Sequence, residues 1–168
     1  CVKCGNITEQ MQEFCPVCVN KQVYYDKLFN VCVYDSTITK FLKMIKFKPK
    51  DDVFERMEFI YNLFSSEFVA IEDFLKISSE VDFLLPVPIH QNRRQARGYN
   101  QSELIADVVG EIFGLKVEAG IIEKQKDTRF FFGLDPQERK QELENAFVII
   151  DKEKIKGKNI VIVDDIST

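Results

Sequence analysis

The stretch that decides the fold lies at the end of the chain and reads Ile160-Val161-Ile162-Val163-Asp164-Asp165-Ile166-Ser167-Thr168. Its run of β-branched residues predicts a buried strand, and two adjacent carboxylates follow directly where that strand ends. Carboxylates in this position can accept hydrogen bonds from the hydroxyls of a sugar, and backbone N–H groups of the following turn can bind a phosphate. An aspartate here is also a common N-cap of a following helix, so the pair by itself leaves both interpretations open.

Apolar residues upstream recur with two periods, which predict alternating helices and strands. Helical spacing predicts helices over 37–47, 53–64, 69–77 and 100–113, and a short helix is expected over 136–143. Apolar runs predict strands over 23–34, 81–87, 115–122, 146–150 and 160–163. Strands that alternate with helices indicate βαβ units, so we expect an α/β fold with a mostly parallel sheet flanked by helices.

The composition narrows the class of protein. The chain has 168 residues, of which 45% are hydrophobic and 30% charged, as is typical of one main globular domain. Its net charge of −4 argues against an overall basic nucleic-acid-binding protein but leaves a local basic patch open. Neither a signal peptide nor an apolar run long enough to span a bilayer is visible. We therefore expect a cytoplasmic protein without membrane insertion.

Four of the five cysteines form two pairs with the spacing of metal ligands. Cys1 and Cys4 are followed, after ten intervening residues, by Cys15 and Cys18. Two turns of this kind complete a tetrahedral S4 site, which suits Zn²⁺. Two disulfides or a redox pair are the alternatives, and disulfides fit poorly with a cytoplasmic protein. We therefore expect structural zinc on these four cysteines, and Cys32 as a small residue of the core.

A second informative stretch follows the predicted strand 81–87. It reads Pro88-Ile89-His90-Gln91-Asn92-Arg93-Arg94-Gln95-Ala96-Arg97-Gly98 and stands just before the predicted helix 100–113. Guanidinium groups bind phosphate bidentately, and a helix N-terminus adds partial positive charge. Arg93, Arg94 or Arg97 is therefore a candidate pyrophosphate ligand, although a solvated basic loop without a ligand has the same composition.

Together these stretches resemble the ComF family of competence-associated, phosphoribosyltransferase-like proteins with an N-terminal zinc finger. The matching residues are the paired cysteines, Tyr34, Lys46-Phe47, Pro86-Val87-Pro88 with His90, Arg97-Gly98-Tyr99-Asn100-Gln101 and Asp164-Asp165. The last segment is also similar to the phosphoribosyl-pyrophosphate (PRPP) motif of type I phosphoribosyltransferases. The resemblance covers nearly the whole chain and implies a zinc finger over 1–22. It also implies a phosphoribosyltransferase-like domain over 23–168, which we expect to continue beyond this sequence.

The resemblance implies one site with several parts. Asp164 and Asp165 would hold the ribose hydroxyls of PRPP, or of a related sugar phosphate, and act as the catalytic pair. Ile166, Ser167 and Thr168 would bind the 5′-phosphate. The arginines of the basic stretch would hold pyrophosphate together with Mg²⁺. We expect Asp165 to lie at an exposed strand end.

Three functions are compatible with these residues. The first is a phosphoribosyltransferase, and whether this protein catalyses transfer is left open. The second is a DNA-handling module that contacts a DNA backbone through the zinc finger and five lysines: Lys40, Lys43, Lys46, Lys48 and Lys50. The first three of these lysines also suit a solvated helix face. The third is a PRPP sensor without turnover. We expect a ComF-like role in DNA uptake, with PRPP as ligand and single-stranded DNA and the competence machinery as the implied partners.

Overall fold

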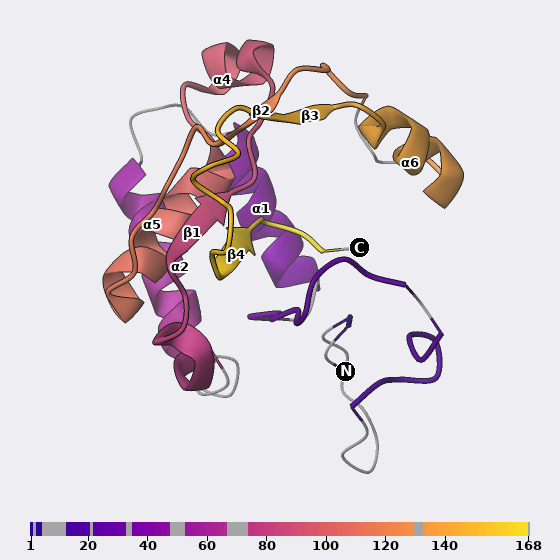
Figure 1. Cartoon of the computed structure of the whole chain (residues 1–168). Coiled ribbons are helices and arrows are strands. Elements are labelled where there is room, and N and C mark those ends of the chain that lie inside the picture. Colours follow the sequence, from indigo (N-terminus) through magenta and orange to yellow (C-terminus); the bar gives the residue numbers. More distant parts are fainter. Residues whose placement is uncertain are drawn as a thin grey trace.

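The computed structural model describes residues 1, 3–4, 13–20, 22–32, 35–47, 53–66, 74–129 and 133–167. Tyr34, Lys48, Lys50 and Thr168 lie outside these residues. The elements follow in the order α1 (Ser36–Phe47), α2 (Val53–Ser66), β1 (Phe83–Pro86), α4 (Gln91–Arg97), α5 (Gln101–Phe113), β2 (Ile122–Lys124), α6 (Pro136–Leu143), β3 (Phe147–Ile149) and β4 (Ile160–Val163) (Figure 1). Residues 74–78, which overlap the end of the predicted helix 69–77, are also helical.

Strand β1 has parallel neighbours on both edges. Leu84 pairs with Val161 of β4 and also forms a parallel bridge with Val117. The Leu84 N–H donates to Lys116 O at 2.8 Å, and the Glu118 N–H donates to Leu84 O at 2.9 Å. All residues of β1 are buried, as a central parallel strand requires, so the continuous apolar run at this position predicted its environment correctly.

Helices α1, α2 and α5 share one hydrophobic core with β1 and β4. Figure 1 shows these helices gathered around β1. The most buried members of this core include Ile45 of α1, Ile60 of α2, Leu84 of β1 and Val108 of α5, each at most 1% exposed. Complete burial of one such side chain stabilises the fold by about 1.5–3 kcal/mol. The predicted helices 37–47, 53–64 and 100–113 are thereby confirmed to within two residues at each end.

Strands β2 and β3 form a separate antiparallel pair, with Ile122 opposite Ile149. Between them lies α6, whose limits match the predicted helix. The Asp135 side chain accepts hydrogen bonds from the Gln137 and Glu138 N–H groups, and the Glu138 side chain accepts one from the Asp135 N–H. This capping box, with proline in the first turn, fixes where the helix begins.

The described fold therefore combines helices with two small sheets. The mostly parallel sheet that we expected is not shown: among the described residues the parallel pairing is limited to β1–β4 and the bridge at Val117, and the other sheet is antiparallel. The likeness to a phosphoribosyltransferase fold stays a prediction. The prediction of strands over 23–34 is wrong for residues 23–32, which form bends and coil without a strand partner. The prediction of a strand over 115–122 is wrong for most of its length. Among the helices of the described ranges, none is both long and apolar enough to cross a membrane.

Candidate functional site

Strand β4 delivers both aspartates to the carboxyl end of the parallel pair. The Val87 N–H donates to Val163 O at 2.9 Å, so β1 and β4 stay paired up to the first carboxylate. Asp164 Oδ1 accepts hydrogen bonds from Ser102 Oγ and from the Asp165 N–H, each at 2.9 Å. Ser102 is fully buried in the first turn of α5. The start of α5 is therefore attached to the end of β4.

Asp164 is exposed as a residue, yet protein atoms remove much of the water around its carboxylate. This desolvation, and after it the negative charge of Asp165, raise the pKa of Asp164 to about 6. The hydrogen bonds from the Asp165 N–H and from Ser102 oppose the rise. Two carboxylates held this close favour a cation or several hydrogen-bond donors beside them.

Asp165 forms an ion pair with Lys46, the last lysine of α1. Lys46 Nζ lies 2.5 Å from Asp165 Oδ2, and the two side chains are 23% and 8% exposed. The prediction that Asp165 lies at an exposed strand end is therefore wrong, because α1 covers it. Apart from this ion pair, Asp165 Oδ2 has no hydrogen-bond partner among the described residues. Lys46 therefore differs from Lys40 and Lys43 of the same helix, because these two residues are exposed.

The basic stretch forms the short helix α4 where we expected a loop. His90 caps its start, because His90 Nδ1 accepts a hydrogen bond from the Asn92 N–H at 3.3 Å. Gly98 ends it with φ at 83°, a left-handed conformation that glycine adopts without strain. Apart from Ala96 this helix consists of polar residues, so no apolar period in the sequence predicted it.

The arginines of α4 divide into two groups. Burial, and then the positive charge of Arg93, lower the pKa of Arg97, and the carboxylate of Asp165 acts in the opposite direction. Arg97 is therefore within electrostatic reach of both Arg93 and Asp165. Arg94 instead pairs with Glu103, with 2.6 Å between Nη1 and Oε1. Of the three predicted pyrophosphate ligands, Arg97 interacts with Asp165, and Arg93 lies close enough to Arg97 to lower its pKa.

The segment after β2 contacts the same basic helix. Arg93 donates a hydrogen bond to Thr128 O, and Arg93 Nε lies 3.5 Å from Asp127 Oδ1. Thr128 is 2% exposed, and its Oγ1 has no hydrogen-bond partner among the described residues. Arg129 is exposed and pairs with Glu142, with 2.8 Å between Nε and Oε1. Thr128 thus contributes to the wall of the site, whereas Arg129 faces solvent.

The turn after the carboxylates is described only in part. Ile166 packs against the main core, and Ser167 is exposed. Thr168 lies outside the described residues, so the predicted 5′-phosphate site stays a prediction.

Two members of this site were missed in the sequence. Ser102 follows the Asn100-Gln101 motif directly, and that position at a helix start is the signal that could have indicated it. Lys124 of β2 is half-buried; burial and the charge of Arg93 lower its pKa, while Asp164 opposes the change. Lys124 therefore lies within electrostatic reach of Arg93 and Asp164, and no sequence pattern signals it.

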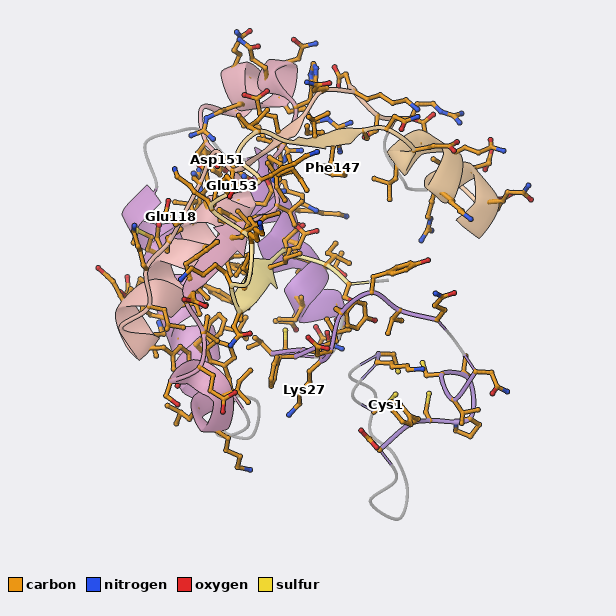
Figure 2. All side chains as sticks on the ribbon, in the orientation of Figure 1. Cys1, Lys27, Glu118, Phe147, Asp151 and Glu153 are labelled. Carbon is orange, nitrogen blue, oxygen red and sulfur yellow. The ribbon has the colours of Figure 1, made fainter. Side chains whose placement is uncertain are left out.

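The cysteines Cys1, Cys4, Cys15 and Cys18 form a second candidate site, with all four Sγ atoms within 4.8 Å of one another. Figure 2 shows sulfur atoms grouped near Cys1. The Cys4 and Cys15 Sγ atoms are 3.8 Å apart, and the described cysteines form no disulfide. Burial, and then the thiols of Cys15 and Cys4, raise the pKa of Cys18 to about 11. This donor set could hold a metal ion such as zinc, which favours four closely spaced sulfur ligands.

Comparisons with known proteins found relatives that match this chain over its full length. Competence protein F of Haemophilus influenzae is 24% identical over 175 residues, which cover 100% of this chain and 72% of that protein. DNA utilization protein YhgH of Escherichia coli K12 is 23% identical over 171 residues, with 100% and 71% covered. No family model matches the chain, and no solved structure is significantly similar to it. The chain is therefore similar over its full length to a competence protein and to a DNA utilization protein.

Proposed function

We propose that this chain is a ComF-like protein of DNA uptake that binds PRPP, or a related sugar phosphate, where β1 and β4 end. One observation carries the proposal: Asp164 and Asp165 lie at the carboxyl edge of the parallel strands β1 and β4, and the Arg97 guanidinium interacts electrostatically with Asp165. Ligands of open α/β sheets bind at this edge. The names of the relatives support the role in DNA uptake.

The side chains divide the ligand between them. Asp164 and Asp165 accept hydrogen bonds from the ribose hydroxyls, and Ser102 holds Asp164 in place for this. Arg93 and Arg97 neutralise the pyrophosphate, which a bound Mg²⁺ would also screen by coordinating its oxygens.

The same arrangement suits phosphoribosyl transfer. A nitrogen nucleophile forms a bond to C1 of the ribose while the bond from C1 to pyrophosphate breaks and pyrophosphate leaves with the electron pair. Positive charge develops on the ribose in the transition state, and the fixed carboxylates of Asp164 and Asp165 stabilise it. If PRPP binds but is neither hydrolysed nor transferred, the protein is a sensor.

We also propose that the cysteine cluster holds a structural zinc ion. Four thiolate ligands leave no open position for a substrate, so the ion serves folding and not catalysis. Few apolar residues surround the cluster in the sequence, and the metal would supply most of the folding free energy of this segment.

Isothermal calorimetry with PRPP and Mg²⁺ on the full-length protein tests the sugar-phosphate site. Asp164→Asn and Asp165→Asn should each weaken PRPP binding by roughly 10–100-fold, because each removes a charged hydrogen-bond acceptor worth about 1.5–3 kcal/mol. Asp151→Asn is the matched control, since Asp151 pairs with Lys154 on a surface loop. Urea unfolding shows whether each variant is folded. Equal affinities in all four proteins would reject the site.

A further inference from the structure

The C-terminal turn of α1 contacts the site at two places, beside the basic helix α4 and at the carboxylate pair. Ile45 O accepts a hydrogen bond from the hydroxyl of Tyr99, which lies between the basic helix α4 and α5. The next residue, Lys46, forms the ion pair with Asp165. Arg56 of α2 is 0% exposed and lies 4.6 Å from the centroid of the Tyr99 ring, which holds that ring against the helices. Two successive residues of α1 therefore contact different parts of the site: Ile45 contacts Tyr99, and Lys46 contacts Asp165.

The negative charge of the two neighbouring carboxylates favours a cation beside them. Asp164 and Asp165 are adjacent, and the proposed ligand brings further negative charge to them. Lys46 Nζ is 2.5 Å from a carboxylate that is only 8% exposed, so water screens their attraction weakly. Without Lys46 the buried carboxylate would keep its desolvation cost and lose its counter-charge.

We propose that Lys46 is a positioning residue of the sugar-phosphate site. Its ammonium holds Asp165 through Oδ2 and neutralises one of the two negative charges beside the ligand. Asp165 Oδ1 then accepts a hydrogen bond from a ribose hydroxyl. This inference rests on the proposed function, because it assigns Lys46 a task in that site. This role is proposed for Lys46 alone and not for Lys40 and Lys43, which are exposed residues of the same helix.

Calorimetry with two ligands tests this role in the full-length protein. PRPP with Mg²⁺ probes the whole site, and inorganic pyrophosphate with Mg²⁺ probes the basic part without the ribose. Lys46→Gln should weaken PRPP binding about tenfold or more and change pyrophosphate binding by less than about twofold. Lys46→Arg keeps the charge and should restore most of the PRPP affinity. Lys43→Gln, on the exposed side of the same helix, is the control and should bind both ligands like the wild type.

A double-mutant cycle adds a readout that general damage to the fold does not reproduce. In the Asp165→Asn background the buried charge is gone, so adding Lys46→Gln should change PRPP affinity by less than about twofold. This background also provides the test if Lys46→Gln alone fails to fold.

The outcomes separate the inference from the proposed function. Wild-type affinity for PRPP in Lys46→Gln, an equal loss of both ligands, or an undiminished effect in the Asp165→Asn background would each overturn the role of Lys46 and leave the PRPP site standing. A wild-type protein that does not bind PRPP would overturn both.

Discussion

Replacing Cys18 by serine should abolish tight zinc binding at the cysteine cluster. In a regular tetrahedron the distance from the metal to each ligand is about 0.61 times the distance between ligands, so the observed 3.8 Å between the Cys4 and Cys15 sulfurs matches Zn–S bonds of about 2.3 Å. Zinc bound by four cysteines or histidines in finger peptides contributes about 10–16 kcal/mol. One ligand in four therefore accounts for roughly 2.5–4 kcal/mol, which corresponds to a loss of affinity of roughly 60- to 700-fold.

Three measurements on the full-length protein check this prediction. Elemental analysis should find one zinc ion per chain, and X-ray absorption should find four sulfur neighbours at about 2.3 Å. Competition with a chromophoric chelator gives the zinc affinity of the wild type, of Cys18→Ser and of Cys32→Ser. The last is the control, because Cys32 is not in the cluster. Absence of zinc from the wild type, disulfides among the four cysteines, or an unchanged affinity in Cys18→Ser would refute the reasoning.

Three further predictions follow from particular contacts. Gly110→Ala should destabilise the protein by about 1 kcal/mol in urea unfolding: overpacking against a carbonyl oxygen 2.8 Å from the new Cβ outweighs the gain in helix propensity, whereas Glu111→Ala on the exposed face should cost nothing. Because burial and the neighbouring carboxylate raise the pKa of Asp164 to about 6, this group takes up its proton as the pH falls through 6. Calorimetry should therefore show PRPP affinity falling from pH 7 to pH 5, and a flat profile would contradict the assignment. If α1 binds DNA, replacing Lys40 and Lys43 by Gln should flatten the salt dependence of DNA affinity, and an unchanged slope would make them a solvated face.

Local sequence signals predicted the elements whose limits depend on local chemistry. The helix α6 begins where Asp135 and Glu138 form a capping box, and β4 is a run of β-branched residues with a clear end. The sequence failed at α4, whose polar residues carry no apolar period, and at residues 23–32. A strand needs a partner, and the sequence of one segment does not say whether a partner is within reach.

The site was predicted in its charged groups but not in their partners. The two aspartates and the arginines were recognisable because of their positions after apolar strands. The partners are remote in sequence: Ser102 and Asp164 are 62 residues apart, and Lys46, which pairs with Asp165, lies in α1. Only the packing of α1 and α5 against β4 brings these residues together, so the burial of Asp165 was not visible in the sequence.

The most direct test of the sugar-phosphate site is a crystal structure of the full-length protein soaked with PRPP and Mg²⁺. We expect density for the ribose beside Asp164 and Asp165, with the pyrophosphate toward Arg93 and Arg97. Density elsewhere on the protein, or an empty carboxyl edge at a PRPP concentration far above its cellular level, would contradict the proposed function.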